Sequence, residues 1–509
     1  MLPFIVRRLL ISLPILLASS LLVFFLVTLS GDPLREFRES SSPDAPQRMA
    51  QMRATLQLDR PFFSRYLDWV GGVIPLRVRA RPIFLEWTSF DFGKTRGGQD
   101  VAALLKNAML TSLRLVLLAT VLAVLLGLVI GIVTAARQYS VIDYSATLAA
   151  FLCFSLPVFW LAVLLKEYGA IKFNDYLERP GLSGPALTLF PLSTALPAAS
   201  LLGVPWTRRA LAAGAGAAAT AGLLLLADAT DWLRNPGISL PVMVILAAGL
   251  GTVAALSFAP LTNRRVLAVG IGAAVAGLIG SVVFDGWVAD PNWSRLLILL
   301  VMAVGLGALV GLAAGVVDRR DGIKAGIMAT TLVGLLVGLD RFVSAWRPGR
   351  TIGTVGPQTP NLAGPYWSRM VDYFGHQILP SLALMLIGFA TFMRFTRASM
   401  LETLNSDYVR TAKAKGLSAA QVILRHAFRT ALIPVITVAT ISFATVIEGA
   451  VITETVFGWR GMGRMFIDGL DEVDPYPVMA FLLVVSVSIV LMNAIADVMY
   501  AVLDPRIRR

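Results

Sequence analysis

Few residues in this sequence combine the types and spacing that catalysis or metal binding requires. The two histidines, His376 and His426, lie on opposite sides of a predicted membrane span, so they do not form a catalytic or metal-binding pair. Gly93-Lys94-Thr95 resembles the end of a phosphate-binding loop, but that loop needs a glycine where Thr88 stands. The single cysteine excludes an intramolecular disulfide and a thiolate cluster. We therefore expect no catalytic, cofactor-binding or metal-binding residue in the chain.

The most informative polar segment is residues 405–434, which predicts a helix, a tight turn and a second helix. Ser406 or Asp407 can cap the first helix, and Gly416 suits the left-handed conformation that ends it. Ser418-Ala-Ala-Gln421 has the spacing of a capping box, which begins the second helix. A segment this long exceeds what chain reversal requires. Two explanations remain open from the residues alone, a docking site for a partner and a basic helix pair on the lipid surface.

Composition indicates that the bilayer surrounds these elements. The 509 residues are 56% hydrophobic and only 15% charged, and apolar runs of membrane-spanning length recur between short charged loops. The net charge of +13 does not indicate nucleic-acid binding, because the basic residues form no single patch with interleaved aromatics. We predict an all-α integral membrane protein with about twelve spans.

The distribution of lysine and arginine predicts the topology. Arg7 and Arg8 place the N-terminus in the cytoplasm, before a first span that we expect to be retained, and residues 31–103 form a long outer segment. Two spans follow, at about 104–135 and 144–165. The last three spans are predicted at about 376–397, 431–452 and 477–502, which leaves both termini in the cytoplasm.

Residues 186–345 form a block rich in glycine, alanine and leucine, whose connectors alternate between basic and acidic. That alternation predicts about six spans. The first, at about 186–204, contains Pro191 and Pro197, so a re-entrant segment is the alternative to a full crossing. The small-residue runs Gly214 to Gly222 and Gly270 to Gly280 favour close helix packing.

The 405–434 segment resembles the permeases of binding-protein-dependent ABC importers, and in particular those for dipeptides, oligopeptides and nickel. Residues 407–416 match the Asp-Tyr-Val-Arg-Thr-Ala-x-Ala-Lys-Gly form of their cytoplasmic loop, although Arg410 and Thr411 depart from the general Glu-Ala-Ala form. Residues 454–463, followed by Asp474, resemble the last outer loop of the family. The two ends of the chain resemble the first of the two permease paralogues.

The resemblance implies a type I ABC importer permease core of about six helices, in residues 1–180 and 366–509, with the 186–345 block inserted between them. It implies that the loop at 398–430 couples the permease to an ATPase. The residues implied for coupling are Asp407, Tyr408, Arg410, Thr411, Ala412, Lys415, Gly416, Arg425 and Pro434. Those implied for an outer gate or a contact with the binding protein are Glu454, Phe457, Gly461, Gly463 and Asp474.

The same resemblance implies the partners. These are a second permease subunit that completes the pathway, two ATPase subunits that bind ATP and magnesium, and an extracytoplasmic binding protein that delivers the substrate. It places the chain in the bacterial cytoplasmic membrane as a subunit without catalytic activity. Peptides are the expected substrate, with nickel chelates, glutathione and oligosaccharides as alternatives.

Lys106 and Arg114 are candidates for the transport pathway. They are eight residues apart in a predicted span and therefore share a helix face. Ionisable groups in a membrane are functional hypotheses by default, and here they would meet a peptide carboxylate. The alternative is that Lys106 extends to the membrane surface and Arg114 has a structural partner.

Two other function classes fit the sequence less well. An ion-coupled secondary transporter fits the number of spans, but such proteins often have two similar halves, whereas the block divides this chain unevenly. A membrane-embedded enzyme would need a convergent nucleophile, base or metal cluster, which the sequence does not contain.

Overall fold

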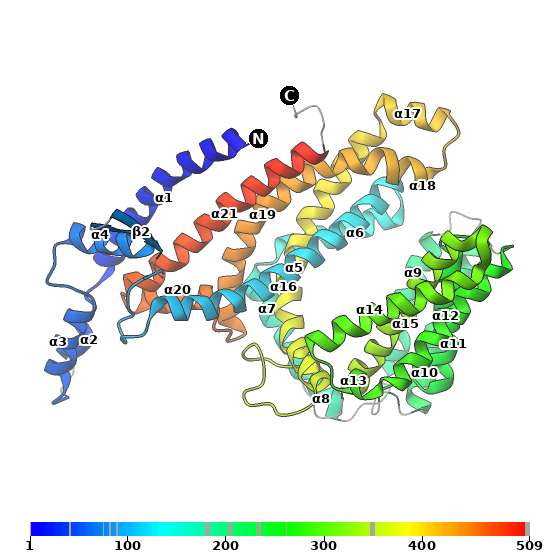
Figure 1. Ribbon diagram of the computed structural model, residues 1–509, viewed down its shortest axis with the longest axis horizontal. Coiled ribbons are helices and arrows are strands. Elements are labelled where there is room, and N and C mark those ends of the chain that lie inside the picture. The colour runs from blue at the N-terminus through cyan, green and yellow to red at the C-terminus, as the bar shows by residue number, and fades with distance from the viewer. Residues whose placement is uncertain are drawn as a thin grey trace. The chain divides into compact units, whose positions relative to one another are not determined.

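Long apolar helices account for most of the chain in the computed structural model, as the composition predicts (Figure 1). The structure describes residues 2–39, 42–74, 76–80, 83–87, 90–178, 184–201, 206–230, 232, 236–260, 262–346 and 352–503. Its contacts divide the chain into two units. Unit 1 comprises Met1–Gly169, Thr354–Pro357 and Gln377–Arg509, and unit 2 comprises Ala170–Gly353 and Gln358–His376.

Unit 1 contains most of the helices that the family resemblance concerns. They are α1 (Leu2–Ser30), α2 (Arg35–Glu39), α3 (Ala45–Thr55), α4 (Phe62–Val73), α5 (Val101–Ala136), α6 (Val141–Ser155), α7 (Val158–Lys166), α17 (Asp407–Ala414), α18 (Ala419–Gln421), α19 (Phe428–Val456), α20 (Met462–Asp471) and α21 (Pro475–Leu503). Helix α16 (Tyr366–Leu404) begins in unit 2 and ends in unit 1. In Figure 1, α17 and α18 lie at one end of α19, and α20 lies at the opposite end.

The predicted outer segment contains the one sheet among the described residues. Strands β1 (Leu76–Ala80) and β2 (Ile83–Trp87) pair antiparallel, with Leu76 opposite Trp87. The all-α prediction is therefore confirmed apart from this hairpin. Helix α4 is attached to α1, because the Tyr66 hydroxyl donates to the Leu17 carbonyl at 3.0 Å.

The span predicted at about 144–165 is bent. Helices α6 and α7 meet at an angle of 102°, with Pro157 at the N-cap of α7 and Leu156 extended before it. A proline disfavours helical backbone at the preceding residue and has no N–H to continue the hydrogen-bond ladder. The proline therefore explains why one apolar run forms two helices.

Unit 2 contains a helix at each of the six places where the sequence predicts a span. Its elements are α8 (Lys172–Glu178), α9 (Gly184–Leu201), α10 (Trp206–Ala229), α11 (Leu240–Leu256), α12 (Arg264–Val283), α13 (Asp285–Ala289), α14 (Trp293–Gly311) and α15 (Gly315–Ser344), with the π-helical turn η1 (Glu167–Ile171) across the unit boundary and the 3₁₀ turn η2 (Leu312–Ala314) before α15.

The described residues contain fewer helices of membrane-spanning length and hydropathy than the predicted twelve. Within the described residues, nine helices are long and apolar enough to cross a membrane, or ten when α6 and α7 count as one broken span. Helices α9 and α11 are not among them. Helix α11 has 17 residues, fewer than the roughly 20 that a crossing needs. Periodicity and charge therefore locate these helices correctly without establishing that each one crosses.

Small residues bring helices of unit 2 into backbone contact, as predicted for the run that begins at Gly270. A Cβ added at Gly270 would lie 2.4 Å from the carbonyl oxygen of Gly251, and one at Gly326 would lie 2.1 Å from that of Gly307. By contrast, Gly214 and Gly222 have no such neighbour within 4 Å. Close packing of this kind replaces the hydrophobic driving force that helices lack inside a bilayer.

We expect Gly326→Leu to destabilise unit 2 by about 2 kcal/mol or more, because the added side chain must separate α14 from α15. The matched control is Gly305→Leu on α14, where a Cβ meets nothing within 4 Å. Thermal unfolding of the purified chain in detergent measures both variants. Equal melting temperatures would contradict the close approach of the two helices.

Candidate functional site

The elbow, which we define as residues 405–421, has the turn chemistry that the sequence predicts. Helix α17 ends before Gly416, whose φ of +77° is a left-handed conformation that glycine adopts without strain. Ser418 and Gln421 form a complete capping box: the Gln421 N–H donates to Ser418 Oγ at 3.4 Å, and the Ser418 N–H donates to Gln421 Oε1 at 3.2 Å. Both predictions are confirmed.

The beginning of α17 differs from the prediction. Ser406 occupies the N-cap position, but its hydroxyl donates to the Thr403 carbonyl at 2.6 Å instead of accepting from the helix. Asp407 is the first helical residue, where its charge complements the positive end of the helix dipole. Its carboxylate is fully exposed, 3.9 Å from the Arg410 guanidinium.

After the elbow the chain widens into a π-helical turn, η3 (Val422–Ala427), that leads into α19. In a π-helix, residues five apart are joined by hydrogen bonds, which brings Val422 and Ala427 toward one face. Both are buried, in a cluster with Val409 and Ala412 of α17. Ala135 of α5, Met400 of α16 and Ala431 of α19 complete that cluster. The elbow is therefore attached to three long helices.

Most of the other described side chains of the elbow are exposed. Tyr408 is 46% exposed and Leu424, one turn beyond the elbow, is 63% exposed. The other predicted coupling residues that are exposed are Asp407, Arg410, Thr411, Lys415, Gly416, Arg425 and Pro434. Ala412 is the exception, since it belongs to the buried cluster. Large apolar side chains among charges are typical of a protein-contact surface.

Sequence reasoning missed an ion pair close to the elbow. Asp143, at the beginning of α6, accepts two hydrogen bonds from the Arg397 guanidinium on α16, at 2.7 and 2.8 Å. Asp143 is buried, and its Oδ2 also accepts from the Tyr139 N–H. Bidentate pairs of this kind fix orientation as well as distance. The available signal was that Asp143 immediately precedes one predicted span and that Arg397 lies at the inner end of another.

At the other end of α19, Glu454 is buried in a polar network. It is 0% exposed, and its carboxylate accepts from the Ser112 hydroxyl at 2.5 Å and from the Arg464 N–H at 3.1 Å. Ser112 in turn accepts from the Met462 N–H at 2.8 Å. These bonds join α5, α19 and α20. In this structure Glu454 offers no surface to a binding protein, so its contacts support a structural role in the outer loop.

Gly461 and Gly463 are required by this network. A Cβ at Gly461 would lie 2.3 Å from the Glu454 carboxylate, and one at Gly463 would lie 2.5 Å from the Val451 Cα. Phe457 is also buried, and the Lys166 ammonium lies 6.0 Å from its ring centre while donating to the Val456 carbonyl at 3.0 Å. The sequence motif therefore corresponds to a tightly constrained turn.

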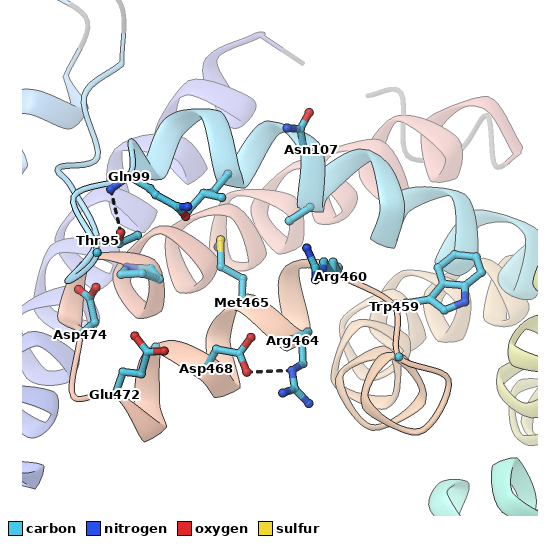
Figure 2. A pocket seen from close by; sticks show the side chains of 17 residues that line it. Thr95, Gln99, Asn107, Trp459, Arg460, Arg464, Met465, Asp468, Glu472 and Asp474 are labelled. Atoms are coloured by element: carbon cyan, nitrogen blue, oxygen red, sulfur yellow. Dashed lines mark hydrogen bonds and ion pairs between the residues drawn. The ribbon is translucent and has the colours of Figure 1, made fainter. Parts of the chain in front are cut away.

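A cavity of 890 Å³ lies beside that turn, and we call it the outer cavity because the predicted topology places it outside the cytoplasm (Figure 2). It is bounded by the 95–99 turn, the beginning of α5 and one face of α20. Its charged lining residues are Arg460, Arg464, Asp468, Glu472 and Asp474. Of the predicted outer residues, Gly461 and Asp474 line it.

Asp474 is a buried carboxylate at the edge of the outer cavity. Its oxygens accept from the backbone N–H groups of Arg96 and Tyr476. Burial raises the pKa of Asp474 from its ordinary value of 3.8 to about 6, since desolvation outweighs these hydrogen bonds.

Lys106 and Arg114 are both exposed on α5, consistent with the shared face that their spacing predicts. Neither belongs to the lining of the outer cavity. The Arg114 carbonyl accepts from the Gln377 amide at 3.0 Å, which joins α5 to α16. Their role in a transport pathway stays a prediction.

This architecture, with many long apolar helices and an exposed helical elbow, is that of a polytopic membrane protein. The chain belongs to the family of binding-protein-dependent transport system inner membrane components, whose model matches residues 297–509. The N-terminal model of the same family matches residues 1–83. The longer match begins in α14, so it overlaps unit 2 as well as unit 1.

Similar proteins are permeases of peptide transport systems. The oligopeptide transport system permease of Mycobacterium tuberculosis is 35% identical over 253 residues, which are 46% of this chain and 77% of that protein. The di/tripeptide permease of Pseudomonas aeruginosa is 37% identical over 233 residues, 41% of this chain and 69% of that protein. The dipeptide permease of Escherichia coli is 46% identical over 138 residues, 27% of this chain and 41% of that protein.

The pKa of Asp474 predicts a pH dependence. The folded chain holds the Asp474 proton more tightly than the unfolded chain, so this group's contribution to stability falls as pH rises from about 4 to about 6 and is constant above that. We expect Asp474→Asn to flatten the melting temperature across this window, measured by intrinsic fluorescence in detergent. Asp471→Asn, at an exposed neighbour, is the control and should keep the wild-type slope. An unchanged slope in Asp474→Asn would contradict the assignment.

Proposed function

We propose that this chain is the permease subunit of an ATP-driven importer of peptides, acting with a second permease, two ATPases and an extracytoplasmic binding protein. Family membership supports the transport role, and the names of the similar permeases support peptides as the substrate class. ATP and magnesium bind the partner ATPases. The chain lies in the cytoplasmic membrane with both termini in the cytoplasm, and the 186–345 block is a helix bundle added to the permease core.

The elbow is the observation that carries this proposal. It exposes Tyr408 and a row of charges, while Val409 and Ala412 attach it to α5, α16 and α19. An ATPase that binds this surface and closes on ATP would move the elbow as one body. Because the attachment is packed, the movement would pass into the membrane helices, as in a coupled domain rotation.

Gly416 provides the sharpest test. A Cβ at this position meets nothing within 4 Å, so a substitution acts through the positive φ and not through a clash. Gly416→Val should cost about 1–2 kcal/mol in the elbow conformation and reduce peptide-stimulated ATP hydrolysis and uptake by roughly tenfold. Gly416→Asn is the matched control and should remain near wild type, because asparagine tolerates this conformation.

Both activities are measured on the complex reconstituted in proteoliposomes, with membrane insertion checked separately. Full uptake and full stimulation by Gly416→Val would show that the elbow does not couple the permease to the ATPases. Equal losses in the valine and asparagine variants would show that side-chain bulk, and not backbone conformation, is what the partner senses.

A further inference from the structure

Helix α20 carries its charges in the order that destabilises a helix. Arg460 precedes it and Arg464 lies in its first turn, whereas Asp468 and Glu472 lie at its C-terminal end. The helix dipole favours acids at the N-terminus and bases at the C-terminus. The Arg464–Asp468 pair, at 2.8 Å, also has the less favourable order for residues four apart. A violation of a local rule on this scale is expected where function requires it.

These four charges form one row along the outer cavity. Each lies four residues after the one before it, and all four line the cavity. Figure 2 shows Glu472 and Asp474 at one end and Arg460 toward the other, with the Arg464–Asp468 pair between. Since Arg464 and Asp468 bind each other, Arg460 and Glu472 are the charges at the two ends. The cavity wall is therefore dipolar, basic at one end and acidic at the other.

The dimensions match a short peptide. Helix α20 rises about 12 Å between Arg464 and Glu472 and about 15 Å between its first residue, Met462, and Glu472, with Arg460 two residues before it. An extended chain covers roughly 3.3–3.6 Å per residue, so three to five residues span these distances. The volume of 890 Å³ lies within the range of ligand sites.

We propose that the outer cavity is a binding subsite for zwitterionic peptides of three to five residues. The peptide α-carboxylate binds Arg460 at the basic end, beside Arg464, and its α-ammonium binds Glu472 at the acidic end, beside Asp468. Guanidinium groups hold a carboxylate through two parallel hydrogen bonds, which makes the basic end specific for a free C-terminus. This inference rests on the proposed peptide function and adds a requirement for both free termini.

The test uses the assembled complex without the binding protein, so that selection by that protein cannot mask the result. A photoreactive diazirine tetrapeptide labels the complex, and mass spectrometry quantifies the label on this chain. The competitors are tetra-alanine, its N-acetyl form and its C-terminal amide. For the wild type, we expect tetra-alanine to compete at least tenfold better than either blocked form.

The variants separate the two ends of the cavity. Glu472→Gln should abolish the discrimination against the N-acetyl peptide and keep that against the amide, and Arg460→Gln should do the reverse. Asp471→Asn and Lys94→Gln change exposed charges outside the cavity lining and should behave as wild type.

Three results would overturn the inference. Unchanged competition in both cavity variants, with uptake retained by the complex, overturns it and leaves the proposed function intact. If the variants instead raise the concentration of binding protein needed to stimulate ATP hydrolysis, with an unchanged competition pattern, the cavity is a protein-docking surface. A wild-type complex that imports no peptide overturns the proposed function together with the inference.

Discussion

A carboxylate without access to solvent fixes the arrangement at one end of unit 1. Removing the Glu454 side chain from water costs several kcal/mol unless hydrogen bonds replace those to water, and here the Ser112 hydroxyl and the Arg464 N–H do so. Because these donors belong to α5 and α20, the hydrogen bonds to the Glu454 carboxylate on α19 determine where the three helices meet. The position of α20, and with it the shape of the outer cavity, depends on this network.

Helix α19 links that network to the elbow. Its 29 residues span about 43 Å, with Ala431 in the buried cluster near one end and Glu454 near the other. The Lys166 side chain bonds the Val456 carbonyl, so α7 is tied to the same end of the helix. No loop therefore separates the buried cluster that holds the elbow from the Glu454 network beside the outer cavity.

The sequence predicts local features well and tertiary polar contacts poorly. Gly416 and the Ser418–Gln421 box were predictable because the interactions lie within a few residues, and the helices of the 186–345 block were located by apolar length and charge. The bend at Pro157 was missed because apolar composition continues through it. The Ser112–Glu454 bond joins residues 342 positions apart, and no periodicity in a single sequence reports such a pairing. For the same reason, a binding role for the α20 charge row could be inferred only from the structure, which places the row along the outer cavity.

The crowding at Gly461 and Gly463 has a consequence for how this transport subunit changes over generations. Every amino-acid substitution at either position introduces a Cβ that meets the Glu454 carboxylate or the α19 backbone. We therefore expect these two positions to remain glycine. Arg460 and Glu472 lie next to the same turn and helix but are exposed, so a substitution there is not confined by the packing that confines the two glycines. A lineage is thus free to vary the chemistry of the cavity while the turn that shapes it stays constant.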